Sequence, residues 1–262
     1  MPVTTARLFD SHCHFDLPEL ASEQAQHWQQ AQHAGVAALL IPAVAAEYWP
    51  ALLELHQQHS YWHIALGIHP WWVDSSQPQD LPLLAQLLQQ HSADICAIGE
   101  IGLDFAIGNH TFDKQQQIFS QQLTLAATWH KPVILHHRKS QSQLLAEIKQ
   151  QQFTEGGILH AFSGSQQQAM AFVDQGFKLG IGGTITYERA AKTRHTVTKL
   201  PLSCFVLETD APAMPLSGFQ GQINTPAQLA RVFQAFCALR PEEPAEIAAT
   251  LWRNSCEVLR LN

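Results

Sequence analysis

Cysteine is scarce and scattered in this sequence, which excludes two kinds of small scaffold. The five cysteines are odd in number and form no Cys-x-x-Cys pair; they are Cys13, Cys96, Cys204, Cys237 and Cys256. A disulfide framework and a zinc site built from thiolates both need paired spacings, and neither is present. We therefore expect reduced thiols, as in a cytoplasmic protein.

Long apolar runs and an excess of basic residues are missing as well. No run approaches the roughly 18 apolar residues that a membrane helix needs, and the first ten residues lack the apolar stretch of a signal peptide. We expect a cytoplasmic protein with no membrane partner and no obligate protein partner. Lys and Arg total 15 against 22 Asp and Glu, a net charge of −7. A bound phosphate therefore needs a local cationic site or a metal ion, because the chain as a whole repels it.

The order of predicted elements favours a barrel. Short apolar runs alternate with stretches of helical periodicity along the 262 residues. The predicted strands are Arg7–His14, Ala37–Val44, Trp62–Leu66, Ile95–Gly99, Pro132–His136, Gly157–His160, Phe177–Gly180 and Cys204–Glu208. This alternation predicts an α/β fold of parallel βαβ units, and eight units in about 250 residues favour a single (β/α)8 TIM barrel domain spanning 1–262. An open doubly wound sheet usually carries a glycine-rich loop after its first strand, and here that strand runs into Asp10-Ser-His-Cys-His14.

Histidine is abundant, with 15 residues, as many as Lys and Arg together. Barrel enzymes keep their chemistry at the carboxyl ends of the strands, and several histidines fall there. His12 and His14 end the first predicted strand two positions apart, so they share a face and Cys13 points the other way. His160 ends the sixth. Taken alone, a His-x-His segment is equally typical of a metal site and of a hydrogen-bonded polar strand end.

Carboxylates end two further strands. Glu100 directly follows the apolar fourth strand, where a carboxylate is costly to bury unless positive charge meets it. It is therefore a candidate bridging ligand between two cations, with an exposed loop acid as the alternative. Asp104 either supports a ligand or begins a helix. Glu208 and Asp210 follow the eighth strand on one face, with Asp210 nearer the barrel mouth.

The fifth predicted strand ends in His136-His137-Arg138. Only one of the two histidines can face the barrel mouth, and the alternation of side chains does not say which. Arg138 shares a face with His136. A guanidinium beside a metal suits bidentate recognition of a phosphate, whereas the alternative is an ordinary ion-pair partner.

Taken together, these residues predict a metal centre. Imidazole and carboxylate groups recur at the ends of strands one, four, five, six and eight, whereas chance would scatter them through helices and loops. Imidazole with carboxylate and no thiolate suits Zn, Mn, Fe, Ni or Mg. Six ligand groups with one central carboxylate are too many for a single tetrahedral ion, so we expect two divalent metal ions about 3.5–4 Å apart.

The chain resembles the TatD family of metal-dependent deoxyribonucleases, which are amidohydrolase-like barrels, and its YjjV-type branch in particular. The resemblance covers essentially the whole sequence. It is carried by Asp10–His14, Gly67–Pro70, Gly99–Asp104, Pro132–His136, His160–Gly164, Gly182–Tyr187 and Leu207–Pro212, and the branch by Met214–Gln222.

This resemblance implies a ligand set and an activity. It assigns one ion to His12, His14 and Asp210, assigns the other to His136 and His160, and makes Glu100 the bridge. The implied activity is hydrolysis of phosphodiesters at a DNA strand end, in the manner of a 3′-end exonuclease, or of a small phosphodiester, by a water that the two ions activate. Asp210 and Glu100 are then the catalytic residues, with Asp210 orienting the water and accepting its proton.

Three further residues are expected to bind substrate. Arg138 adds a phosphate clamp, His69 donates to the leaving group or binds phosphate, and Tyr187 steadies a phosphate. An unliganded loop histidine is the alternative for His69.

Two other functions remain as alternatives. Related barrels hydrolyse cyclic amides, esters or lactones, but the bridge on strand four is then often a carboxylated lysine, so Glu100 favours the phosphodiesterase. The second alternative is a barrel that binds metal without catalysis. The complete set of metal ligands, together with an acidic residue that can act as a base, disfavours this alternative.

Overall fold

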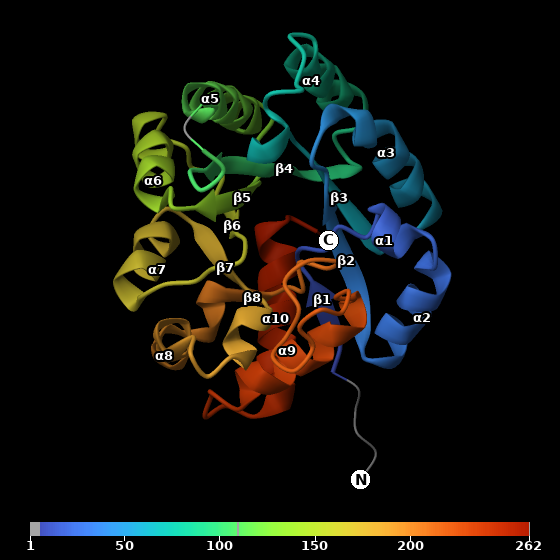
Figure 1. The fold of residues 1–262 in the computed structure, drawn as a ribbon, viewed down its shortest axis with the longest axis vertical. Helices are drawn as coiled ribbons and strands as arrows, with labels where there is room; N and C mark the ends of the chain where they lie inside the picture. Colours follow the sequence, from blue (N-terminus) through green and yellow to red (C-terminus); the bar gives the residue numbers. More distant parts are fainter. Residues whose placement is uncertain (1–5, 109, 262) are drawn as a thin grey trace.

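The computed structural model describes residues 6–108 and 110–261, in which a ring of parallel strands lies inside a ring of helices (Figure 1). Residues 1–5, 109 and 262 of the predicted domain lie outside the described residues. The strands are β1 (Leu8–Asp10), β2 (Val36–Pro42), β3 (Trp62–Leu66), β4 (Ile95–Asp104), β5 (Val133–Arg138), β6 (Gly157–Leu159), β7 (Phe177–Ile181) and β8 (Phe205–Leu207). They form one eight-stranded sheet in sequence order, and each strand runs parallel to the next.

Helices connect the strands and cover the outside of the sheet. They are α1 (Pro18–Ala21), α2 (Gln24–His33), α3 (Trp49–Gln58), α4 (Asp80–Gln90), α5 (Phe112–Thr128), α6 (Gln141–Gln150), α7 (Gln166–Val173), α8 (Ala191–Lys199), α9 (Leu229–Cys237) and α10 (Pro244–Val258). Within the described ranges, no helix combines the length and apolar character needed to cross a membrane.

Backbone hydrogen bonds between the segment that follows β1 and the end of β8 with its following loop close the ring. Ser11 N donates to Leu207 O at 2.9 Å. Asp210 N donates to His12 O at 2.9 Å, and His14 N donates to the carbonyl of Ala211 at 2.8 Å. The predicted (β/α)8 barrel is therefore confirmed, and the seam that closes it runs through the segments that carry the predicted metal ligands.

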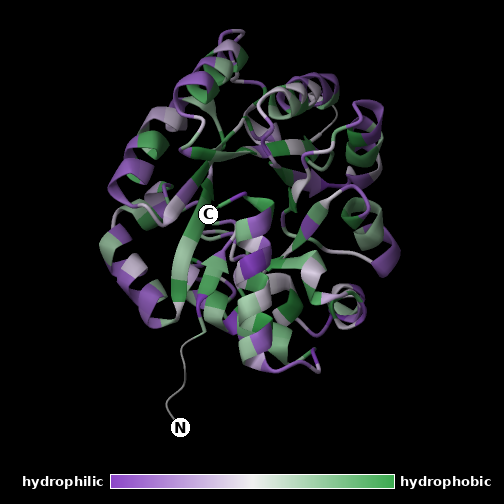
Figure 2. Ribbon diagram, turned by 180° about the vertical axis from the view of Figure 1, so that it is seen from behind, coloured by the Kyte–Doolittle hydropathy of each residue, from purple (hydrophilic) through white to green (hydrophobic). Residues whose placement is uncertain are grey.

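Two apolar layers bury both faces of the strands. The inner layer takes buried residues from seven of the eight strands: Phe9, Ala38, Leu40, Ala65, Cys96, Ala97, Ile134, Ile158 and Val206. The outer layer packs against the helices. Strands buried on both faces are mostly apolar, and Figure 2 shows them mostly green, whereas the helices mix green with purple. Trp252 of α10 packs against the inner layer, and Arg7 lies over its ring at 3.9 Å, so α10 covers the amino end of the barrel, opposite the strand ends that carry the histidines.

Two strands end four or five residues from the predicted position, whereas the bounds of the other six differ from the sequence prediction by at most two residues. The first was expected to reach His14, but β1 ends at Asp10, whose carboxylate accepts hydrogen bonds from Thr209 N at 2.9 Å and from Thr209 Oγ1 at 2.6 Å. The fourth was expected to end at Gly99, but β4 continues to Asp104. Gly102 makes this possible, because it has a φ of +142° and a Cβ there would lie 2.1 Å from the carbonyl oxygen of His136. Glu100 therefore lies inside a strand and not after one.

Candidate metal centre

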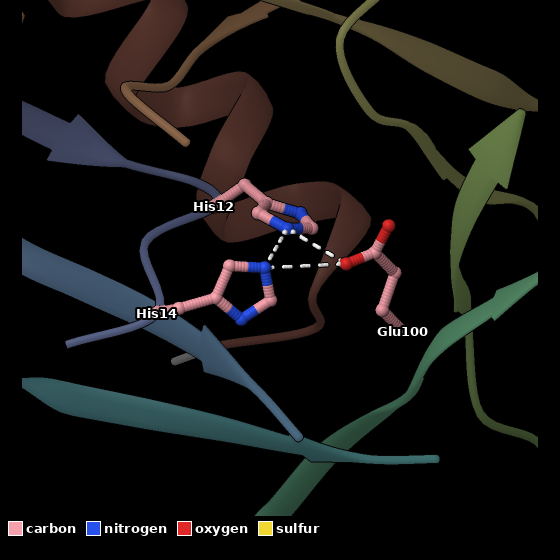
Figure 3. A group of neighbouring side chains, drawn as sticks. All are labelled: His12, His14 and Glu100. Atoms are coloured by element: carbon pink, nitrogen blue, oxygen red, sulfur yellow. Dashed lines mark hydrogen bonds and ion pairs between the residues drawn. The ribbon is translucent and has the colours of Figure 1, made fainter. Parts of the chain in front are cut away.

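His12 and His14 follow β1 and turn their imidazoles to the same side (Figure 3). Their Nε2 atoms are 3.2 Å apart. The Nδ1 of His14 lies 3.2 Å from the carbonyl oxygen of Pro42, which can only accept, so Nδ1 carries the proton and Nε2 presents a lone pair. Cys13, between them, is fully buried and packs into the outer apolar layer, as the alternation of side chains predicts.

Glu100 lies beside this histidine pair, with only 1% of its surface exposed. Its Oε2 lies 3.1 Å from Nε2 of His12 and 3.3 Å from Nε2 of His14. Burial opposes ionisation of this carboxyl, but the surrounding imidazoles of His69, His12 and His160 outweigh burial and hold its pKa well below its usual range. Glu100 is therefore a buried carboxylate that stays charged.

The other oxygen of Glu100 faces a second group of histidines. Oε1 lies 2.8 Å from Nδ1 of His136, 3.5 Å from Nε2 of His69 and 3.7 Å from Nε2 of His160. The two oxygens of this one carboxylate thus face two separate sets of imidazoles. This is the arrangement that a bridging carboxylate requires.

Asp210 completes the first group from the loop after β8. Its Oδ1 lies 3.7 Å from the Nε2 atoms of both His12 and His14. Burial raises the pKa of Asp210 to about 6, although the imidazoles of His160 and His14 oppose the rise. Its φ of +56° lies in the left-handed region, so the alternation of a strand does not extend to it. Asp210 and Glu208 accordingly take different roles.

Glu208 supports His160 from the side away from Glu100. Its Oε1 lies 3.3 Å from Nδ1 of His160 and accepts a hydrogen bond from Ala161 N at 2.6 Å. The His160 ring also stacks on that of His12, with centroids 3.7 Å apart. Burial lowers the pKa of His160, but Asp210, Glu208 and Glu100 outweigh it and raise the pKa to about 10. The carboxylates around this histidine therefore favour a positive charge at its position.

Of the two adjacent histidines in β5, His136 faces the site. Its Nδ1 contacts Glu100, and its Nε2 lies 3.3 Å from Oδ2 of Asp104. Asp104 is fully buried and also accepts hydrogen bonds from Trp71 Nε1 at 2.7 Å and Ala106 N at 2.8 Å. It therefore orients an imidazole and does not simply begin a helix. His137 instead lies beside Gln141 of α6, at 3.4 Å.

Residues 9–260 match the protein family described as TatD related DNase. The chain belongs to the TatD family. It is 44% identical over 249 residues to YjjV of Escherichia coli K12, named an uncharacterized metal-dependent hydrolase, with 95% of this chain and 96% of that one covered. It is 40% identical to an uncharacterized metal-dependent hydrolase of Haemophilus influenzae, with 95% of this chain and 98% of that one covered.

Structural comparison gives the same family. The crystal structure of the E. coli YjjV protein, a TatD homolog, has a TM-score of 0.93 at 42% identity, with 98% of this chain and all of that one covered. A more distant relative from Citrobacter koseri, 28% identical over 253 residues with 93% of this chain and 95% of that one covered, is named 3'-5' ssDNA/RNA exonuclease TatD. The family resemblance predicted from the motifs is confirmed.

The side chains of this TatD protein fit a divalent cation. Two ligand atoms bonded to one ion at about 2.1 Å lie about 3.0–3.4 Å apart in octahedral or tetrahedral geometry. The two Nε2 atoms of His12 and His14 and Oε2 of Glu100 are separated by 3.2, 3.1 and 3.3 Å. Among the described residues, three groups bring possible ligand atoms within 4.8 Å of one another: His12, His14 and Glu100; His12, His160 and Glu208; and His69, Glu100 and His136. The last group includes His69, which the sequence assigned to substrate and not to a metal.

A hydrogen bond from the backbone of Trp71 fixes the tautomer of His69. Trp71 N donates to its Nδ1 at 3.1 Å, so in the neutral ring the proton lies on Nε2, which points toward Glu100. Burial lowers the pKa of His69 to about 4, which keeps the ring neutral. His69 is therefore arranged as a hydrogen-bond donor at the edge of the site.

A cavity of about 390 Å³ opens onto these groups. His14, His69, Glu100, His136, His160 and Asp210 line its base, and its walls include Leu17, Val44, Trp71, Trp72, Pro212 and Ile223. The two tryptophans are not among the expected site residues, because an aromatic pair after His-Pro is equally typical of a core.

Arg138 and Tyr187, two of the three expected substrate-binding residues, lie outside this cavity. The Arg138 side chain is 58% exposed, lies 4.0 Å from Asp104 and lines a hollow beside α6. The Tyr187 hydroxyl donates to the carbonyl of Pro215 at 2.7 Å, and its ring lines a separate hollow with Arg189 stacked on it at 4.7 Å. The structure thus brings together His69 and the six expected ligands, but not these two.

Proposed function

We propose that this TatD-family hydrolase cleaves phosphodiester bonds at the accessible end of a DNA strand, using two divalent cations. The observation that carries the proposal is the position of Glu100, whose two oxygens face separate sets of imidazoles. His12, His14 and Asp210 would hold one ion, and His136 and His160 the other. Paired metal ions a few ångströms apart are characteristic of sites that displace groups at phosphorus.

When bound, the two ions would supply an activated water and neutralise the charge that develops on the phosphoryl oxygens. Asp210 would orient that water and accept its proton, because its Oδ1 lies 3.7 Å from the Nε2 atoms of His12 and His14, beside the position of the first ion. His69 presents its Nε2 proton at the cavity edge, where it can donate to the leaving group or to a phosphoryl oxygen. Asp104 and Glu208 hold His136 and His160 in position.

The names of two distant relatives support this reaction class. The Citrobacter koseri protein and a Salmonella typhimurium protein, 29% identical over 252 residues with 92% of this chain and 95% of that one covered, are both named as exonucleases of single-stranded DNA and RNA. Hydrolysis of a cyclic amide, ester or lactone is the second candidate, because the partly apolar cavity would also admit a small uncharged ring.

The test is turnover by the metal-loaded protein on four substrate classes in parallel. These are 3′-labelled single-stranded DNA, an RNA oligomer, p-nitrophenyl phosphodiesters and a lactone panel. We expect release of nucleotides from the labelled DNA end and its loss in Glu100→Gln. Turnover of the lactones alone would replace the nuclease with the second candidate. If the protein binds metal but turns over none of these substrates, the remaining interpretation is a non-catalytic metal-binding barrel.

A further inference from the structure

Trp71 is a large apolar side chain that stays exposed at the rim of the metal-capable cavity. It belongs to the short 3₁₀ turn Pro70–Trp72 that follows β3, and 54% of its surface is open to solvent. Ligand pockets are lined mainly by apolar and aromatic side chains, so an exposed aromatic ring on the wall of this cavity is a candidate contact for a ligand. Trp72 extends this wall, since the two indole rings lie 19° from parallel with centroids 6.2 Å apart.

The Trp71 ring is held in place before any ligand arrives. Its indole N–H donates to the buried carboxylate of Asp104 at 2.7 Å, and its backbone N–H donates to Nδ1 of His69 at 3.1 Å. The His69 ring packs edge-on against it, with centroids 5.4 Å apart. Because the side chain is already ordered, a ring that stacks on it loses less conformational entropy on binding.

The remaining walls are apolar except for Glu19, and they carry no Lys or Arg. Leu17, Val44, Pro212 and Ile223 line the cavity, and none of its described lining residues is Lys or Arg. Since the net charge of the chain is −7, a run of phosphates finds little attraction here. A cavity of about 390 Å³ is the size of a small-molecule site and not of a groove for many nucleotides.

We propose that Trp71 is the stacking platform for the base of the terminal nucleotide, so that the site reads one base and one scissile phosphate. This rests on the proposed function and adds the means of recognition. Every nucleobase has a π-face, so such a platform tolerates sequence but requires a base. Recognition of a single phosphate also predicts that activity depends weakly on salt concentration, because the protein contacts few phosphates of the DNA.

The experiment compares two labelled single-stranded DNA substrates that differ only at the 3′ end. One ends in a normal nucleotide and the other in a tetrahydrofuran abasic residue. We expect the manganese-loaded wild-type protein to have a kcat/KM about 5- to 150-fold higher for the normal end, the range of one base–aromatic stack. Trp71→Ala removes this preference by lowering kcat/KM for the normal end only.

Trp71→Phe separates stacking from the hydrogen bond to Asp104. It keeps an aromatic face and loses the N–H donor, so we expect it to retain most of the preference. If it loses as much as Trp71→Ala, the role of Trp71 is to hold Asp104 and the platform is wrong. The control is Tyr61→Ala, which removes a side chain that is 59% exposed beside the start of β3, at the other end of the barrel, and should change neither substrate.

The outcomes distinguish this inference from the proposed function. Hydrolysis of neither substrate by the wild-type protein contradicts the nuclease itself. Equal kcat/KM for the two ends in the wild-type protein overturns the platform and leaves the nuclease standing, and this comparison needs no variant to fold. An equal loss on both substrates in Trp71→Ala also overturns the platform.

Discussion

Gly180 of β7 is the position from which the metal centre can be disturbed without touching a ligand. A Cβ at Gly180 would lie 2.1 Å from Oε2 and 2.7 Å from Cδ of Glu208. Glu208 is fully buried and tied to Ala161 N at 2.6 Å, so it cannot withdraw without losing that bond. Gly180→Ala must therefore displace the carboxylate that supports His160.

The expected cost has two parts. Overpacking a buried position costs about 1–3 kcal/mol of the free energy of unfolding, which for a chain of this size lowers Tm by roughly 5 °C. Losing the partner that orients an imidazole weakens metal affinity by about 10–100-fold. Thermal unfolding without metal measures the first part, and calorimetric titration with Mn²⁺ or Zn²⁺ measures the second.

Gly182→Ala is the matched control. A Cβ there lies 3.5 Å from Cγ of Glu208, an ordinary contact, and the φ of −109° suits alanine. We expect nearly wild-type stability and affinity. If Gly180→Ala also binds metal as tightly as the wild-type protein, Glu208 does not support a ligand and the assignment of His160 loses its physical basis.

Three other measurements test the site and the fold. His136→Ala should abolish turnover and remove one bound metal ion with little unfolding, whereas His137→Ala should be mild; unchanged turnover in His136→Ala would remove that residue from the mechanism. Metal ions at about 100 times their Kd should stabilise the folded protein by about 2.7 kcal/mol and raise Tm by roughly 5–10 °C, so a Tm that does not respond to Mn²⁺, Zn²⁺ or Mg²⁺ argues against a metal centre. Burial, aided by His56, lowers the pKa of His63 to about 4, and the unfolded chain takes up that proton near pH 6.5, so stability is lost as pH falls from about 6.5 to 4. His63 should contribute on the order of 2 kcal/mol to the loss of unfolding free energy between pH 7 and 5, and urea unfolding of His63→Gln should show a loss smaller by that amount; an equally steep loss in that variant would assign the effect elsewhere.

Much of the architecture follows from the sequence because strand and helix patterns alternate. The order of the strands and the gathering of imidazoles and carboxylates at their carboxyl ends follow from that alternation. The residues at which the strands end could not be predicted from this pattern, because tertiary contacts determine them. The carboxylate of Asp10 binds Thr209 across the seam, and a glycine at position 102 lets β4 pass close to β5.

The parts of the site that were missed depend on contacts between distant segments. Nothing near Trp71 in the sequence indicates that Asp104 will fix its ring. Spacing placed Glu208 beside Asp210 on one face, but the left-handed backbone at Asp210 gives them different neighbours. For Tyr187, the hydroxyl is taken by the carbonyl of Pro215, from a loop that a local pattern cannot position.

The seam between the first and last strands also determines when the proposed metal site can form during synthesis of the chain. His12 and His14 are made early by the ribosome, but their backbone partners, Asp210 and Ala211, emerge only after most of the chain has been translated. A growing polypeptide therefore carries its first two imidazoles without the framework that aims them. If these residues hold metal ions as proposed, the ions can bind there only when synthesis is nearly finished, and a product truncated before this point lacks the complete site.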